Sequence, residues 1–232
     1  MMQGVFRFRT IRLEGQIPRP IRAALLRKTK MWEDRFATSE YVFGQEPAAF
    51  LADHADLLTQ GATALAVADG EGRNSVFMAQ QGMQVCALEY APSAIAKAKA
   101  LAQRHGVADQ VAFHQVDVMR YDWPKVYDLV AGIFIQFVGP DDRTDLFDGM
   151  KTSVAPGGLI LLHGYTPKQI EFGTGGPPTP ANMYTEAMLR AAFEGWEIIR
   201  CAEYERDIRE GTGHSGRSAL IDLIARKPLD VG

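Results

Sequence analysis

Short apolar runs alternate with helical stretches through most of this chain. Five mostly apolar runs predict buried strands, at residues 63–68, 84–89, 111–116, 127–137 and 159–163. Four segments with helical spacing lie around them, at residues 46–58, 74–81, 92–105 and 143–154. Strands that are apolar throughout and alternate with helices are typical of a parallel sheet covered on both faces. The pattern therefore predicts an α/β class of fold, a doubly wound, Rossmann-like sheet.

The end of the chain departs from this alternation. A helix at residues 185–193 is followed by two strand-like runs, at 196–205 and 218–225. The glycine-rich link 210–216 is too short for a crossover helix, so these two strands are expected to pair antiparallel. Before the fifth strand, Pro156-Gly157-Gly158 predicts a turn. The sheet is thus expected to have seven strands, mostly parallel, with an antiparallel strand at the C-terminal end.

Residues 1–30 differ in composition from the rest. They hold eight basic residues against one acid, a net charge of +7, whereas the whole chain of 232 residues carries −3 and residues 31–232 therefore carry −10. We expect residues 1–30 to be a basic extension outside the core and residues 31–232 to form one domain. A short docked helix at 21–28, or an arm that touches nucleic acid or membrane, are the alternatives.

The acidic body argues against nucleic acid as a partner, because it would repel phosphates. No apolar run approaches the ~20 residues of a membrane helix, so no membrane span is expected. Only two cysteines are present, which excludes a disulfide scaffold, and no cluster has the spacing of metal ligands, so no metal is expected.

The strongest local signal is the segment Asp69-Gly-Glu-Gly72, between a strand and a helix that Asn74 is expected to cap. Gly70 and Gly72 would let a ligand approach the backbone closely. Glu89 ends the second strand, where a carboxylate can accept hydrogen bonds from ribose hydroxyls. Asp117 ends the third, within reach of an adenine amino group. Together they indicate an adenosine site; the alternative is solvated acids at strand ends.

Other nucleotide patterns fit poorly. The phosphate-binding loop motif with its Lys is absent, and Ser75 stands where the dinucleotide motif has its third glycine. A turn that holds Asp69 and Glu71 is an unfavourable place for pyrophosphate and a better one for a cation.

These residues resemble those of class I S-adenosylmethionine-dependent methyltransferases, and within that class the tellurite-resistance (TehB-like) and thiopurine methyltransferase group. The resemblance covers about residues 31–227. Its motifs are Trp32-Glu-Asp-Arg35, Tyr41-Val-Phe-Gly44, Gly70-Glu-Gly-Arg-Asn74, Pro156-Gly-Gly158 and Ile224-Ala-Arg-Lys227. The family usually has an acid in place of Ala66 and a glycine in place of Ala68.

The resemblance implies S-adenosyl-L-methionine as cofactor and S-adenosyl-L-homocysteine as product. It also implies that the segment before the first helix folds over the cofactor, with the Tyr41 ring near the sulfonium. The cofactor-binding residues expected from the motifs and strand ends are Arg35, Tyr41, Asp69, Gly70, Gly72, Asn74, Glu89, Tyr90, Asp117, Val118 and Ile133.

Methyl transfer is an in-line displacement, for which the protein mainly supplies alignment and exclusion of water. The fourth strand lacks the motif of amino-nitrogen methyltransferases, which favours a soft or anionic acceptor atom. No catalytic residue is assigned, and each candidate has a structural alternative. Gln136 could orient the substrate or cap its strand, and His163 could be a base or a hydrogen-bonded structural histidine. His214 and Arg217 could bind an anionic substrate or belong to a solvated hairpin.

Residues 165–183, rich in Gly and Pro, follow the fifth strand and are expected to form a lid over the acceptor. The function predicted is methyl transfer to a small molecule, a thiol or a metalloid oxyanion, by a cytoplasmic monomer or homodimer. One alternative is a non-catalytic protein that senses an S-adenosyl ligand or serves as a partner subunit. The other is a nucleotide-dependent oxidoreductase.

Overall fold

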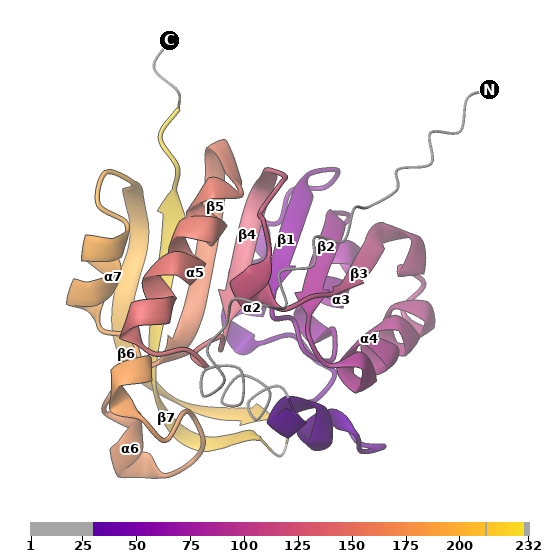
Figure 1. The fold of residues 1–232 in the computed structure, drawn as a ribbon, viewed down its shortest axis with the longest axis horizontal. Helices are drawn as coiled ribbons and strands as arrows, with labels where there is room; N and C mark the ends of the chain where they lie inside the picture. The colour runs from indigo at the N-terminus through magenta and orange to yellow at the C-terminus, as the bar shows by residue number, and fades with distance from the viewer. Residues whose placement is uncertain (1–29, 212, 230–232) are drawn as a thin grey trace, which may run out of the picture.

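A seven-stranded sheet forms the centre of the computed structural model, which describes residues 30–211 and 213–229 (Figure 1). The strands are β1 (Thr63–Val67), β2 (Gln84–Glu89), β3 (Val111–Gln115), β4 (Tyr127–Ile133), β5 (Val154–Tyr165), β6 (Glu197–Glu210) and β7 (His214–Arg226). Their order in the sheet is β3-β2-β1-β4-β5-β7-β6. Strands β1 to β5 are parallel, and β7 pairs antiparallel with both β5 and β6. The predicted fold class and the antiparallel end are confirmed.

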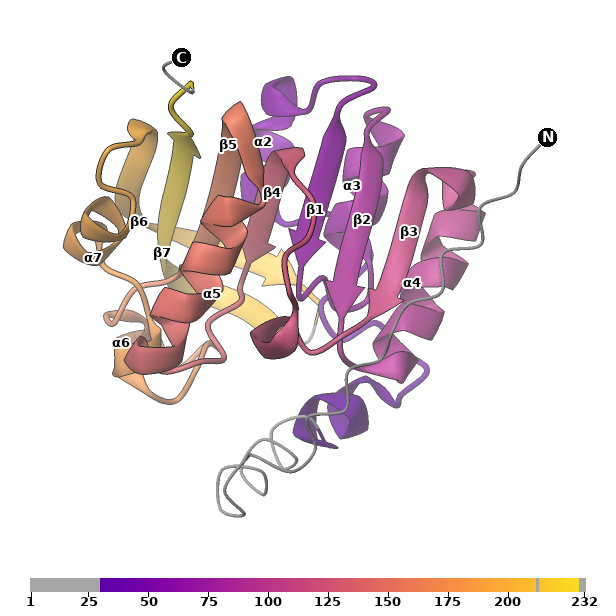
Figure 2. The same ribbon diagram turned by 45° about the horizontal axis from the view of Figure 1, so that its top comes forward.

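Helices follow the parallel strands as predicted. They are α2 (Ala49–Asp53), α3 (Arg73–Gln80), α4 (Pro92–Arg104), α5 (Pro140–Thr152), α6 (Gln169–Phe172) and α7 (Glu186–Ala192). Single 3₁₀ turns lie at Ala55–Leu57, Ala108–Gln110, Val118–Arg120 and Pro180–Asn182. Residues 30–36 are helical and lie beside α4 (Figure 2). Within the described part of the chain, no helix has the length and apolarity that a bilayer crossing needs.

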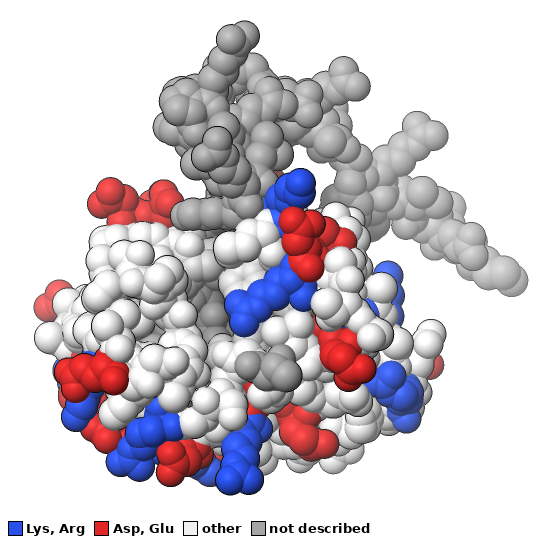
Figure 3. All heavy atoms as spheres, turned by 90° about the horizontal axis from the view of Figure 1, so that it is seen from below, with Lys and Arg blue, Asp and Glu red and all other residues white. Residues whose placement is uncertain are grey.

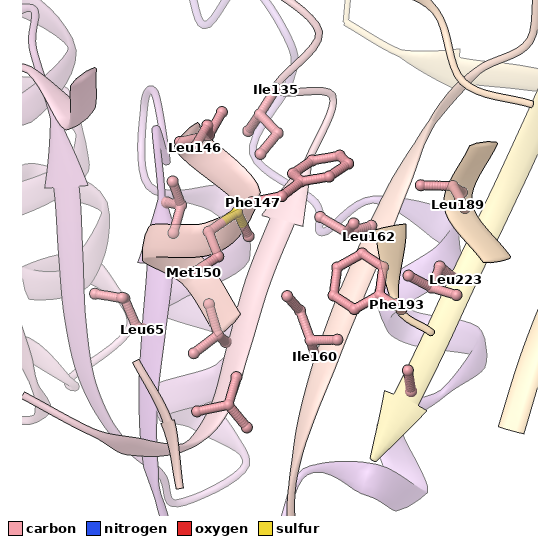
Figure 4. Packing of buried hydrophobic residues seen from close by; sticks show 14 of the residues in the cluster. Leu65, Ile135, Leu146, Phe147, Met150, Ile160, Leu162, Leu189, Phe193 and Leu223 are labelled. Atoms are coloured by element: carbon pink, nitrogen blue, oxygen red, sulfur yellow. The ribbon is translucent and has the colours of Figure 1, made fainter. Parts of the chain in front are cut away.

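Successive side chains of the strands point to opposite faces of the sheet and contribute to two hydrophobic cores. Leu65 of β1 belongs to the core that includes residues of α5 and α7, while its neighbours Ala64 and Ala66 belong to the core that includes residues of α2, α3 and α4. Figure 4 shows the first core, where Phe147 and Met150 of α5 lie over the sheet. Burying each such side chain contributes about 1.5–3 kcal/mol. The two cores hold the sheet between its helices and so fix the carboxyl ends of the strands.

Two boundaries differ from the prediction. Strand β5 begins at Val154, and Pro156-Gly157-Gly158 lies within it as an irregularity in the pairing with β4, not as a turn before it. Strands β6 and β7 continue to Glu210 and from His214, so the predicted link is mostly strand. A two-stranded ribbon satisfies its own backbone hydrogen bonds, so it tolerates glycine and polar residues that are typical of loops.

The extended ribbon of β6 and β7 crosses the carboxyl edge of the sheet. In Figure 1 its yellow end passes beneath the parallel strands and reaches the indigo segment that begins at residue 30. The interpretation of residues 1–30 as an extension falls outside the described residues, except for residue 30, which is helical.

Candidate functional site

The turn after β1 is built from backbone in the left-handed region. Ala68 has φ 49°, Gly70 64° and Gly72 91°. A Cβ on Gly72 would lie 2.6 Å from the Cβ of Ala98 in α4, so glycine is required there for the helices to approach. The turn starts α3 directly at the carboxyl edge of the sheet.

The Asp69 side chain, and not that of Asn74, accepts a hydrogen bond from the first turn of α3. Its carboxylate accepts hydrogen bonds from the backbone N–H of Ser75 at 3.2 Å and from the Ser75 hydroxyl at 2.5 Å. Burial raises the pKa of Asp69 to about 6. The N-cap prediction for Asn74 is wrong, because Gly72 holds that position and the Asn74 side-chain oxygen accepts from Ala48 N at 3.0 Å, before α2.

Glu89 joins the ends of β1 and β2. One carboxylate oxygen accepts from Gly70 N at 2.8 Å, and the other accepts from Tyr90 N and Ala91 N, both at 2.8 Å. Burial raises the pKa of Glu89, although these three donors favour the ionised form. A carboxylate has about four acceptor positions, so this one retains capacity for a ligand hydroxyl. Tyr90, the next residue, is exposed beside it.

Asp117 follows β3 and caps the 3₁₀ turn at Val118–Arg120. It accepts from Met119 N at 3.1 Å, and its second oxygen lies 3.7 Å from Arg120 Nε. Val118 is buried, and Ile133 ends β4, which β2 and β1 separate from β3. Since β3, β2 and β1 are neighbours, the two acids and the glycine turn predicted for an adenosine site lie at one edge of the sheet.

Residues 30–44, which we call the cover segment, lie over the glycine turn. A Cβ on Gly70 would lie 3.7 Å from the Phe36 ring, which stacks on Trp32 with ring centres 5.6 Å apart. Glu33 accepts from Ser93 N at 3.2 Å at the start of α4. The Arg35 guanidinium lies 4.8 Å from the centre of the Phe43 ring, and burial lowers its pKa. This segment therefore encloses the turn, as the resemblance implied.

Tyr41 does not take the place expected for it. Its hydroxyl donates to Lys97 O and accepts from Arg104, both at 2.9 Å, and its ring lies 5.3 Å from the Arg104 guanidinium carbon. These contacts lie on α4. Phe36, not Tyr41, is the ring beside Gly70.

Two buried ion pairs were missed by the sequence analysis. Glu71 in the turn lies 2.7 Å from Lys97 Nζ of α4, and Arg73 lies 2.7 Å from Glu210 at the end of β6. Arg73 also donates to Phe43 O at 3.1 Å. These contacts tie the turn to α4, to the cover segment and to the ribbon. Sequence carries no signal for a pair 137 residues apart, beyond the charges in the turn.

Gln136 and His163 have structural partners. The Gln136 amide donates to Tyr165 O and accepts from Tyr165 N, both at 2.7 Å, which supports the capping interpretation. His163 Nδ1 lies 2.8 Å from Asp222 Oδ1, and its ring stacks on Phe50 at 4.9 Å. The interpretation of His163 as a hydrogen-bonded structural histidine has the stronger support.

The structure separates His214 from Arg217. Arg217 is half exposed and lies 3.0 Å from Glu205, which it faces on the outside of the ribbon. His214 is buried among the rings of Phe43, Phe134 and Tyr165, whose centres lie 4.5, 4.3 and 5.5 Å away. The expectation that both bind one anionic substrate is not supported.

The segment 165–183 has more structure than a loop. It contains α6, and Gln169 of that helix accepts from Ala219 N of β7 at 2.8 Å and donates to Thr174 at 3.0 Å. Its role as a lid stays a prediction. Among residues 30–211 and 213–229, no three His, Cys, Asp or Glu side chains are placed to share a metal ion.

Comparison with known proteins agrees with this arrangement. Residues 64–158 match a family described as a methyltransferase domain. The fold is similar to TehB from Haemophilus influenzae, with 17% identity, a TM-score of 0.63, and coverage of 86% of this chain and 67% of that one. It is also similar to the N-methyltransferase NodS from Bradyrhizobium japonicum WM9 in complex with S-adenosyl-L-homocysteine, with 12% identity, a TM-score of 0.66, and coverage of 87% and 98%.

A third similar structure comes from work on the conversion of a disulfide bond into a thioacetal group during echinomycin biosynthesis, with 18% identity, a TM-score of 0.70, and coverage of 88% and 93%. No curated protein sequence matches the chain. At these identities the structures show a shared fold. The family match covers residues 64–158, less than half of the chain, and agrees with the methyltransferase class that the sequence predicts.

Proposed function

We propose that this protein transfers the methyl group of S-adenosylmethionine to a small-molecule acceptor bound at the carboxyl edge of β4 and β5. The observation that carries this proposal is the link between Glu89 and Gly70, which holds a carboxylate against the glycine turn after β1. In this arrangement Glu89 binds the ribose, and Asp117 with Val118 holds the adenine at the end of β3. Tyr90 and Ile133 line its two sides.

The methionine end of the cofactor extends toward the cover segment. Arg35 is a cation at this end that has no ion pair with the described residues, and it is suited to a carboxylate. Phe36 beside Gly70 is the ring suited to a sulfonium. The bound cofactor supplies the methyl group, and these residues orient it and exclude water.

The acceptor is a small molecule that is methylated on a soft atom, a thiol or a metalloid oxyanion. We expect the acceptor site between the cover segment, the ribbon and the end of β5, where Phe43, Phe134 and Tyr165 lie around His214. On the face seen in Figure 3, basic and acidic side chains of the described residues alternate around the rim and form no continuous basic patch for a nucleic acid.

Calorimetry with S-adenosylhomocysteine tests the cofactor assignment. The wild-type protein is expected to bind it, and Glu89→Gln to bind it 10- to 100-fold more weakly, about 1.4–2.7 kcal/mol, because a charge-assisted contact is lost. Asp128→Asn is the matched control, since Asp128 also accepts a backbone N–H, from Thr63 at 2.8 Å, but where β1 begins. Equal affinities of the two variants would contradict the ribose assignment.

Turnover separates an enzyme from a sensor. Incubation with labelled S-adenosylmethionine and thiols, phenols or tellurite is expected to yield a methylated product. Binding of S-adenosylhomocysteine without any turnover would favour the non-catalytic alternative. Binding of NAD in its place would favour an oxidoreductase.

A further inference from the structure

Two buried polar atoms on the acceptor side have no hydrogen-bond partner among the described residues. They are the Tyr165 hydroxyl and His214 Nδ1, on side chains that are 1% and 7% exposed. The nearest charged group to His214 Nδ1 is Glu210 Oε2 at 3.8 Å, which is too far for a hydrogen bond. Most buried polar groups in folded proteins are paired, so each such atom calls for an explanation.

Both groups lie close to Gly175. A Cβ on Gly175 would lie 2.9 Å from Gly213 O, 3.5 Å from the Tyr165 hydroxyl oxygen and 3.8 Å from the His214 ring. Phe134, the residue after β4, contacts both rings, with centres 4.9 and 4.3 Å away, and its backbone has φ 57°. Strained backbone of this kind is common at functional sites. A ligand here would have an apolar body and one group that both donates and accepts.

The charges around His214 suit a neutral base that becomes a cation during a reaction. Burial lowers the pKa of His214, with Arg73 and Arg35 acting in the same direction and Glu210 opposing them. Burial also disfavours ionised Glu210, but its contacts with His214 and Arg73 outweigh this and lower its pKa to about 2. A fixed carboxylate 3.8 Å from a neutral imidazole makes no hydrogen bond with it, but its negative charge stabilises the protonated form of the ring.

His163 offers a contrast. Its Nδ1 is already bonded to Asp222, which also accepts from Arg200 at 2.8 Å and Tyr204 at 3.1 Å. That carboxylate belongs to a completed network. His214 Nδ1, in contrast, has no hydrogen-bond partner among the described residues.

We infer that His214, through its unpartnered Nδ1 beside the Glu210 carboxylate, is the general base that takes the proton of a thiol acceptor, and that the Tyr165 hydroxyl donates a hydrogen bond to the same sulfur. The inference rests on the proposed function. The acceptor sulfur forms a bond to the methyl carbon as the bond from that carbon to the sulfonium sulfur breaks, and the electron pair of that bond stays on the leaving sulfur. The thiol proton moves to His214 and then to solvent.

The test compares two thiols of similar size, benzyl mercaptan, which is weakly acidic, and 4-nitrothiophenol, which is ionised at neutral pH. His214→Gln is expected to lower kcat/KM for benzyl mercaptan at least about 100-fold, the range of a lost general base. For 4-nitrothiophenol, which needs no base, the expected loss is below about fivefold. In a plot of log kcat/KM for benzyl mercaptan against pH, the wild-type values should fall with slope one as pH drops below the pKa of His214. The His214→Gln variant should not show this fall.

Controls separate a base from a structural role. Tyr165→Phe should reduce turnover of both thiols by a similar factor, because its hydrogen bond does not depend on their acidity. His114→Gln, an exposed histidine of β3, should change neither. Equal losses for the two thiols in His214→Gln, or none, would overturn the assignment. So would a wild-type protein that binds S-adenosylhomocysteine and methylates neither thiol, whereas absence of that binding would instead contradict the proposed function.

Discussion

Ala68 occupies left-handed backbone, φ 49°, at the position where the family that the sequence resembles usually has glycine. This conformation costs an L-residue about 1–2 kcal/mol, which glycine would relieve. Glycine also makes the unfolded chain more flexible, which destabilises the folded protein by about 0.4–1 kcal/mol. Ala68→Gly is therefore expected to stabilise the protein by up to about 1 kcal/mol, seen as a rise of about 2–4 °C in Tm. On this interpretation, alanine in place of glycine at position 68 strains the turn and does not remove a contact.

The neighbouring alanine provides the control for this prediction. Ala66 lies in β1 and is buried, so Ala66→Gly should destabilise by about 0.5–1 kcal/mol. Calorimetric melting of both variants measures the difference. Destabilisation of similar size in both would show that the left-handed turn carries no strain.

Asp69 should make the stability of the protein depend on pH. Its pKa is about 6 in the folded state and about 3.9 in an unfolded chain, so the folded state binds more protons between these values. Stability from this group is present below pH 4 and is lost as pH rises through 6, by up to about 3 kcal/mol. Urea unfolding from pH 4 to 7 should show wild type losing this amount relative to Asp69→Asn. A difference between the two that does not vary with pH would contradict the shift.

Residue types at strand ends were predictable where local chain order decides them. Glu89 and Asp117 reach the expected edge because Glu89 is the last residue of β2 and Asp117 lies two residues after the end of β3. Asn74 and Arg217 did not take their expected roles, because competing partners from distant segments decide them: Ala48 for Asn74 and Glu205 for Arg217. Sequence separation hides such partners.

At the scale of elements, glycine residues let the end of the ribbon of β6 and β7 pack closely against the cover segment. Gly211 has φ 65°, and a Cβ on it would overlap Val42 O of the cover segment, while Gly213 N donates to Val42 O at 3.0 Å. Gly211→Ala should displace the end of the ribbon and lower methyl transfer at least tenfold, about 1.4 kcal/mol of barrier. Stability of the sheet should change little, because the clash lies outside both cores.

Gly195 supplies the matched control. It has φ 83° and a Cβ there would meet nothing within 4 Å, so Gly195→Ala brings the backbone strain without the overlap. Turnover in Gly195→Ala should stay near wild type. An equal loss of turnover in both variants would show that docking of the ribbon is not the cause.

The element pattern was predictable because hydrophobic periodicity reports burial, which the sheet imposes on every parallel strand. The ribbon was underestimated because its outer half pairs only with itself and buries few apolar side chains. Its reach over the edge, and the Arg73–Glu210 pair that anchors it, depend on tertiary contacts that no local pattern encodes.

At the scale of the whole molecule, we expect the part of the chain needed for folding and cofactor binding to begin with the cover segment. Deleting residues 1–29 should leave the free energy of unfolding within about 1 kcal/mol and cofactor affinity within about threefold, since the contacts of Phe36 and Glu33 remain. Deleting residues 1–36 removes both and should weaken S-adenosylhomocysteine binding at least tenfold. Calorimetry on the two truncated proteins measures this. A large loss in the shorter deletion would show that the basic residues belong to the site.

Strand β7 comes last in the chain but lies between β5 and β6 in the sheet. During synthesis, β5 therefore leaves the ribosome with an open edge, and β6 has no neighbour until residues 214–226 follow. An open, apolar strand edge is a template for pairing with other chains. A polypeptide truncated before His214 is thus expected to aggregate instead of folding, and we expect rapid degradation of such a polypeptide in the cell.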